Sequence, residues 1–172
     1  MKIIKKGNRN YRKRLVLLKA GLPRLVIRKT GSRIIGQIVQ YDVNGDKTLA
    51  SVSGTELKKF GWTFSGKNIP AAYLLGLLLS RKTKVKEVVV DKGMRTFHAG
   101  SFINFFVRGI QDGGVNAHFD KMQLSDDRMF GNHISEYFGK AKGNQFSKLG
   151  EKVKNIKEEF QSAIDKIKIY GA

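Results

Sequence analysis

Hydrophobic and polar positions alternate in the first third of the chain and predict three short strands. Within 24–29, Leu25 and Ile27 point to one side while Arg24, Val26 and Arg28 point to the other, which is the two-residue period of a strand. A Thr-Gly-Ser turn follows, and Asn44-Gly45 is a strong hairpin signal further on. The three strands, 24–29, 34–41 and 48–53, are therefore expected to form an antiparallel meander.

Longer hydrophobic periods before and after the meander predict helices, which alternate with two further strands. Pro70 suits the first turn of one helix, and Gly113-Gly114 closes another. The apolar run 85–90 suits a buried central strand. The predicted helices are 11–20, 71–80 and 101–110, and the predicted strands are 85–90 and 115–119. This order indicates an α/β fold: a mixed β-sheet, made of the meander plus a crossover strand, with helices packed on it.

The last part of the chain has a different pattern, typical of an amphipathic helix over 146–169. Its apolar residues are spaced by three and four positions, and lysines lie off that stripe. Two interpretations stay open, a helix docked on its own domain or one that docks on a neighbouring protein or an RNA groove. The stripe consists of Leu149, Val153, Ile156, Phe160, Ala163 and Ile167.

Three regions follow from these patterns. We expect a basic N-terminal arm with a short helix over 1–20, an α/β domain over 21–120, and a C-terminal extension over 121–172.

Basic residues outnumber acidic ones, with 33 Lys and Arg against 14 Asp and Glu and a formal net charge of +19. A surplus this large is unusual for a soluble enzyme. It favours a polyanionic partner, because each phosphate that a cation neutralises releases condensed counterions. The alternative is a solvated basic surface that only aids solubility.

The charge is concentrated at the N-terminus. Residues 1–41 carry 12 basic side chains and no acidic one, whereas 91–139 carry 5 basic and 6 acidic residues. A run this one-sided repels itself without a counter-charge, and such arms commonly order on RNA. Asn10 and Tyr11 add groups that hydrogen-bond the RNA backbone or stack on a base.

Several classes of site are excluded by composition. Without cysteine there is no disulfide, thiolate zinc site or cysteine nucleophile, and the three histidines lack the spacing of a metalloprotease. No apolar run approaches the roughly 20 residues of a membrane helix. We expect a soluble cytoplasmic protein without cofactor, metal, membrane association or small-molecule substrate.

Two patterns imitate enzyme sites. Gly61–Lys67 matches the start of a phosphate-binding P-loop, but Asn68 replaces the Ser or Thr that holds magnesium, so an RNA-facing loop or a surface turn is the better interpretation. Three carboxylates suggest a metal-dependent nuclease, yet they occupy usual turn positions. Those carboxylates are Asp42, Asp46 and Asp91. Asp126 and Asp127, before an apparent helix, are interpreted as caps.

Several ordered segments resemble one family, large-subunit ribosomal protein eighteen, over roughly residues 9–138. They are Tyr11-Arg12-Lys13-Arg14-Leu15, the run 21–29 beginning Gly21-Leu22-Pro23, Gln37-Ile38-Val39 through Leu49-Ala50-Ser51, the run 70–76, Asp91-Lys92-Gly93, Gly100-Ser101 and Asp112-Gly113-Gly114. The run 128–134 is similar to an extension found in archaeal and eukaryotic members. The loop 61–69 and the segment 92–97 depart from the family pattern, and the helix 146–169 does not align with it.

The resemblance implies a structural constituent of the large ribosomal subunit that is not an enzyme. Such a protein binds 5S rRNA and helps attach it to the large-subunit rRNA in the central protuberance, beside neighbouring ribosomal proteins. Two rivals remain, a general structured-RNA-binding α/β protein and a metal-dependent nucleic-acid enzyme.

The candidate RNA-binding residues fall into four groups. The N-terminal arm and helix supply Lys5, Lys6, Arg9, Asn10, Tyr11, Arg12 and Arg14. The meander supplies Arg24, Arg28, Lys29, Ser32, Arg33 and Gln37. Lys67 comes from the glycine-rich loop. Lys92, Arg95 and His98 follow a strand end and form either a second contact or an ordinary solvated loop.

Overall fold

A computed structural model describes residues 11–93, 98, 100–119, 124–140 and 150–170. Its centre is a five-stranded mixed sheet in the order β3-β2-β1-β4-β5. The strands are β1 (Arg24–Lys29), β2 (Ile34–Gln40), β3 (Lys47–Ser53), β4 (Glu87–Asp91) and β5 (Asn116–His118). The antiparallel pairs β1–β2 and β2–β3 confirm the predicted meander, while β4 pairs parallel to both β1 and β5.

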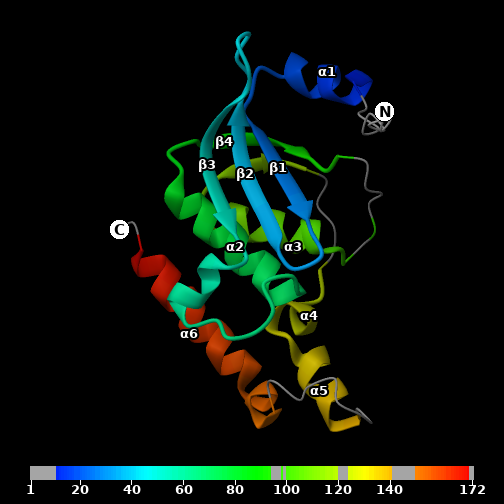
Figure 1. The fold of residues 1–172 in the computed structure, drawn as a ribbon, viewed down its shortest axis with the longest axis vertical. Helices are drawn as coiled ribbons and strands as arrows, with labels where there is room; N and C mark the ends of the chain where they lie inside the picture. The colour runs from blue at the N-terminus through cyan, green and yellow to red at the C-terminus, as the bar shows by residue number, and fades with distance from the viewer. Residues whose placement is uncertain (1–10, 94–97, 99, 120–123, 141–149, 171–172) are drawn as a thin grey trace, which may run out of the picture.

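Two helices provide the crossovers and cover one face of the sheet. α2 (Ile69–Lys82) precedes β4, and α3 (Phe102–Asp112) precedes β5; both lie behind the meander in the view of Figure 1. They approach closely because Gly76 and Gly109 lack side chains: a Cβ on either would lie 2.1 or 2.2 Å from a carbonyl oxygen of the other helix. The predicted mixed α/β fold is therefore confirmed.

The hydrophobic core lies between the sheet and these helices. Leu25, Ile27, Ile38 and Val88 point into it and are fully buried. The alternation along 24–29 predicts this for Leu25 and Ile27, and the apolar run 85–90 predicts it for Val88. α2 is buried from Pro70 to Ser80, because other elements surround it. The opposite face of the sheet is therefore the one that is left to present polar side chains.

The C-terminal helix docks on its own domain, which decides between the two interpretations of its apolar stripe. A 3₁₀ turn, Gly150–Asn155, leads into α6 (Ile156–Ile169), which packs on α2. Val153, Ile156, Phe160, Ala163 and Ile167 of the stripe are buried, and so is Ile164. The prediction of one continuous helix from 146 is wrong for 150–155, and 146–149, with Leu149, lie outside the described residues.

An aromatic cluster joins α6 to the rest of the domain. The Phe160 ring lies 6.3 Å from Trp62, 5.6 Å from Tyr73 and 5.7 Å from Phe130, measured between centroids. Trp62 and Phe64 are 1% and 6% exposed. The interpretation of 61–67 as an RNA-facing loop or a simple surface turn is therefore wrong for these two aromatic residues, which point inward.

The hydrophobic pattern of the sequence did not specify four of the helices and 3₁₀ turns that the structure shows. The 3₁₀ helix Glu56–Phe60 precedes the 61–67 loop, and α4 (Asp126–Phe130) and α5 (Asn132–Lys140) follow β5. Asp126 and Asp127 lie in the first turn of α4, while Ser125 occupies the cap position, so their interpretation as caps is wrong. The fourth is the 3₁₀ turn before α6.

Among the described residues, no helix is long and apolar enough to cross a membrane.

Candidate RNA-binding face

The face of the sheet opposite α2 and α3 presents polar side chains from its three central strands. The register places Val26 of β1 between Gln37 of β2 and Asp91 of β4, and Gln37 beside Ser51 of β3. In the described part of the chain no helix lies in front of this face (Figure 1). We call these four positions, together with Arg24 and Arg28 of β1, the outer face.

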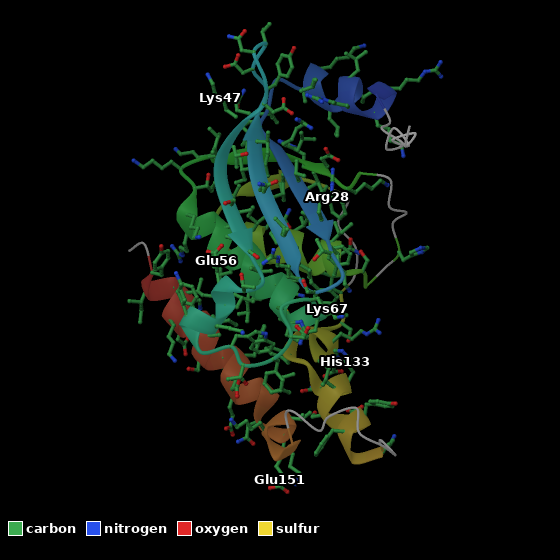
Figure 2. All side chains as sticks on the ribbon, viewed as in Figure 1. Arg28, Lys47, Glu56, Lys67, His133 and Glu151 are labelled. Atoms are coloured by element: carbon green, nitrogen blue, oxygen red, sulfur yellow. The ribbon has the colours of Figure 1, made fainter. Side chains whose placement is uncertain are left out.

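The turn between β1 and β2 extends the outer face with exposed cations. Thr30 closes the turn, with its backbone N–H donating to the Arg33 carbonyl at 2.9 Å, and Ser32 and Arg33 are exposed. The Lys67 ammonium donates to the Gly31 carbonyl at 3.0 Å. The structure therefore brings the predicted residues Ser32, Arg33 and Lys67 together; Figure 2 labels Arg28 and Lys67.

An ion-pair chain of five side chains connects α1 (Tyr11–Lys19) to the sheet. Arg14 donates to both oxygens of Asp46 at 3.0 and 3.1 Å, and Arg24 donates to the same carboxylate at 2.6 Å. Arg24 also donates to Asp91 at 3.2 Å. Arg28 donates to the other Asp91 oxygen at 3.3 Å. Because cations and anions alternate, three arginines converge with little mutual repulsion.

Arg24 is the buried centre of this chain, so little of it is accessible for the RNA contact that the sequence predicted. The residue is 5% exposed, and its guanidinium lies between the carboxylates of Asp46 and Asp91. The strand alternation correctly predicted the side of the sheet on which the Arg24 side chain lies. Asp46 of the β2–β3 hairpin, however, covers that side chain. Arg24 therefore holds the hairpin, β1 and β4 together through its two carboxylate partners.

Arg28 differs, because it is anchored and still accessible. Its side chain is 45% exposed. It donates to the carbonyls of Ile27 and Asp91, both at 2.9 Å, in addition to its ion pair. Gly93 has a φ of +66°, and a Cβ there would lie 3.2 Å from the Arg28 guanidinium carbon. The geometry fixes one edge of the guanidinium while leaving part of it open to solvent.

The remaining predicted residues are distributed as follows. Arg12 is exposed on α1, Lys29 lies with its ammonium 5.3 Å from the centre of the Phe102 ring, and Lys92 is half-buried just after β4. His98 is exposed, and its carbonyl accepts hydrogen bonds from Ser101 and Asn104 at the start of α3. Lys5, Lys6, Arg9, Asn10 and Arg95 lie outside the described residues, as does the side chain of Tyr11.

Comparison with known proteins identifies the family. The family model described as ribosomal large subunit proteins 60S L5 and 50S L18 matches residues 4–98. A large ribosomal subunit protein uL18 from Korarchaeum cryptofilum is 35% identical, over 95% of this chain and 90% of its own. Its counterparts from Methanococcus maripaludis and Methanoregula boonei are each 37% identical, covering 95% and 94% of this chain and 90% of their own.

The chain belongs to this family. The resemblance seen in the sequence is therefore confirmed, in its archaeal-type branch. Members of the L5/L18 family are structural components of the large ribosomal subunit and not enzymes, which places the chain among the ribosomal proteins.

The two enzyme-like patterns have structural explanations consistent with L5/L18 membership. Asn68 caps α2 by accepting from the Ala71 N–H at 2.9 Å, which accounts for an amide where a P-loop has a hydroxyl. Arg24 binds Asp46 and Asp91, two of the three carboxylates of the nuclease hypothesis. The third carboxylate, Asp42, pairs with Lys47, which lowers the pKa of Asp42 below its ordinary value.

Sequence reasoning missed the two acidic members of the ion-pair chain. Asp46 and Asp91 were weighed only as metal ligands or turn residues. Each of them had a signal in the sequence. Asp46 lies in the hairpin just after the most basic segment of the chain, and Asp91 ends the strand predicted over 85–90. Carboxylates so placed in a basic region are candidates to orient arginines.

Proposed function

We propose that this ribosomal protein binds 5S rRNA through its outer face, its β1–β2 turn and α1, and helps attach that RNA to the large-subunit rRNA in the central protuberance. The observation that carries the proposal is the ion-pair chain, which fixes Arg14 and Arg28 at two places along a basic surface. The choice of 5S rRNA as the partner comes from the family resemblance.

The arrangement of charge supports an RNA ligand. Arg28 on the strand, Arg33 in the turn and Lys67 beside it supply cations, while Gln37 and Ser51 supply hydrogen-bonding groups between them. Phosphate contacts of this kind position a protein, and A-form RNA is recognised mostly by shape and backbone. A rigid sheet with cations along one side is suited to that mode of binding.

Asp91 has a positioning role in this proposal. It accepts from Arg24, from Arg28 and from the Gly93 N–H, the last at 2.8 Å. An arginine held in this way loses less side-chain entropy when it binds a phosphate than a free one does. This half-buried carboxylate therefore serves the basic face although its own charge opposes RNA.

The basic arm and the region 21–120 have separate roles. The arm, with Lys5, Lys6, Arg9 and Asn10, follows phosphates, while the α/β region 21–120 supplies the shaped surface. Lys92, Arg95 and His98 form a second contact. The extension 121–172 supports the domain through α6 and faces neighbouring ribosomal proteins.

A competition experiment tests the proposal. Binding of the full chain to purified 5S rRNA is measured over a series of salt concentrations, with transfer RNA in excess as competitor. The proposal predicts binding that survives the competitor and whose logarithm falls linearly with the logarithm of salt concentration. Equal competition by both RNAs would favour the general structured-RNA binder instead.

A further inference from the structure

We infer that the β3 side of the domain carries a second RNA-binding surface, which takes the phosphate backbone of the large-subunit rRNA while 5S rRNA occupies the outer face. The connector between α2 and β4, residues 81–86, forms this surface together with the 3₁₀ helix Glu56–Phe60. We call these two segments the edge surface. The inference rests on the proposed function and adds to it the place where the second RNA is held.

The edge surface is strongly basic. The connector reads Arg-Lys-Thr-Lys-Val-Lys, with no acidic residue, and the 3₁₀ helix contributes two further lysines and the carboxylate of Glu56. Val85 packs on the core between Lys84 and Lys86, so these two lysines extend outward on the same side. All the cations of the edge surface are exposed, namely Lys58, Lys59, Arg81, Lys82, Lys84 and Lys86.

An ion pair fixes the connector against the 3₁₀ helix and closes the edge of β3. The Lys82 ammonium binds one Glu56 oxygen and also donates to the Ser51 carbonyl at 3.4 Å. The other Glu56 oxygen accepts from the Ser53 N–H at 3.0 Å; Figure 2 labels Glu56. Backbone groups of β3 that an added strand would use are therefore already bonded, so this edge is unsuited to strand addition by a protein partner.

The local fold does not account for the lysines at the end of the connector. Arg81 and Lys82 lie in the last turn of α2, where cations stabilise the helix dipole. Lys84 and Lys86 come after the C-cap, Thr83, and so lie beyond the turn in which that effect acts. β4 pairs on both sides, so these lysines do not protect an exposed strand edge either. Cations placed in this way fit a polyanion outside the chain.

The nearby acidic side chains have other partners. Glu87, next to Lys86 in the sequence, lies 3.7 Å from the His118 imidazole of β5. Asp120 is the one acidic side chain of the 14 in the sequence that lies outside the described residues. It follows β5, whose register with β4 runs away from Lys86. In the part of the chain that the structure describes, neither Lys84 nor Lys86 forms an ion pair.

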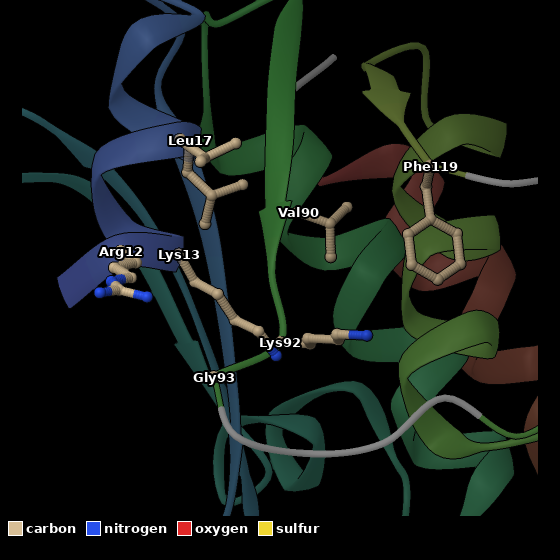
Figure 3. A pocket seen from close by; sticks show the side chains of 8 residues that line it. Arg12, Lys13, Leu17, Val90, Lys92, Gly93 and Phe119 are labelled. Carbon is tan, nitrogen blue, oxygen red and sulfur yellow. The ribbon is translucent and has the colours of Figure 1, made fainter. Parts of the chain in front are cut away.

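The edge surface and the outer face point in different directions. α2 packs on the opposite side of the sheet from the outer face, so its end and the connector lie behind the sheet on the β3 side (Figure 1). Along β4, Lys86 precedes the first residue and Asp91 is the last, so at about 3.3 Å per residue they are roughly 16 Å apart. Figure 3 shows the far end of β4, where Val90 and Gly93 lie beside α1. An RNA helix that lies on the outer face therefore leaves the edge surface to a second RNA segment.

A ternary binding experiment tests the inference. The full chain is saturated with 5S rRNA, and its affinity for purified large-subunit rRNA is then measured over a series of salt concentrations. Lys84→Gln combined with Lys86→Gln removes two proposed phosphate contacts. The affinity for large-subunit rRNA should fall about tenfold, and the slope of its salt dependence should fall by about 2. The affinity of this double variant for 5S rRNA alone should stay within about twofold of the wild type.

Lys152→Gln combined with Lys154→Gln is the matched control. Both lysines are exposed in the 3₁₀ turn before α6, and Figure 2 labels Glu151 of that turn well away from Glu56. The control removes the same charge, and both of its RNA affinities should stay near those of the wild type. Thermal unfolding of the two double variants reports whether the fold is kept.

Three results would overturn the second surface while leaving 5S rRNA binding by the outer face intact. They are a saturated wild-type chain that does not bind large-subunit rRNA, an edge variant that binds it as the wild type does, and a control that loses as much affinity as the edge variant. Equal losses for both RNAs would contradict the inference in another way, because the edge surface would then belong to the 5S rRNA site. A wild-type chain that fails to select 5S rRNA over transfer RNA would instead overturn the proposed function, and the inference with it.

Discussion

The outer face and the aromatic cluster are held together by different physics, although both join segments distant in sequence. The aromatic cluster packs Phe160 against Trp62, Tyr73 and Phe130, with Phe160 fully buried. The outer face depends on charge, with Arg24 between two carboxylates and Arg28 half-exposed beside them. The comparison teaches that stability and the proposed RNA binding are separable here, because one region excludes water and the other keeps access to it.

The largest effect on stability is expected in the aromatic cluster. Phe160→Ala should lower the free energy of unfolding by about 4 kcal/mol, because it removes a buried ring and leaves a cavity. Urea denaturation measures this change. Tyr170→Ala, which removes a ring at the exposed end of α6, is the control and should cost much less; equal losses would show that α6 does not anchor the domain through Phe160.

Arg24 should be the residue of the outer face whose loss affects folding. Arg24→Met keeps an apolar stem but leaves Asp46 and Asp91 without their shared cation, at a cost of roughly 3 kcal/mol. Arg81→Met, at an exposed site near the end of α2, is the matched control in the same denaturation assay. A stable Arg24→Met variant with weakened RNA binding would restore Arg24 as an RNA contact.

Asp91→Asn distinguishes a role of Asp91 in positioning Arg28 from a simple effect of its negative charge on RNA binding. Removing a negative charge from a basic face should tighten RNA binding if only net charge matters. If Asp91 orients Arg28, binding to 5S rRNA should instead weaken about fivefold, the equivalent of about 1 kcal/mol. Asp126→Asn removes an exposed carboxylate on α4 and controls for the change in net charge. Tighter binding by both variants would rule out the positioning role.

The exposed arginines should affect RNA binding and leave the fold intact. Arg28→Ala and Arg33→Ala each remove one proposed phosphate contact, and each should reduce the slope of the salt dependence by about 1. Their unfolding curves should match the wild type within about 0.5 kcal/mol. Unchanged affinity of both at moderate salt would contradict the placement of the RNA on this face.

The sequence predicted what depends on short-range periodicity. β1 begins and ends where the alternation places it, and the predicted starts of β2 and β3 agree with the structure to within one residue. β4 begins at Glu87 rather than at 85, because Val85 packs on the core without pairing. Family membership was also readable, since the motifs occur in order along the chain.

What the sequence could not predict depends on partners far away in the chain. Arg24 is buried because Asp46 and Asp91 reach it from 22 and 67 residues away, and a strand pattern contains no information about them. Trp62 lies in a stretch rich in Gly and Ser, and it packs against Phe160 of α6, almost a hundred residues later. Thr63, beside it, bonds Glu159 across 96 positions. By contrast, α5 carried a readable signal, with Ile134 and Phe138 four residues apart and both packed on the core.

Hydrogen–deuterium exchange of the full chain, with and without 5S rRNA, tests the separation of the two regions most directly. The account predicts slower exchange on RNA binding in α1 and the β1–β2 turn, with α6 unchanged. Protection confined to α6 and α5, with α1 and the turn unaffected, would contradict it and place the RNA on the opposite end of the molecule.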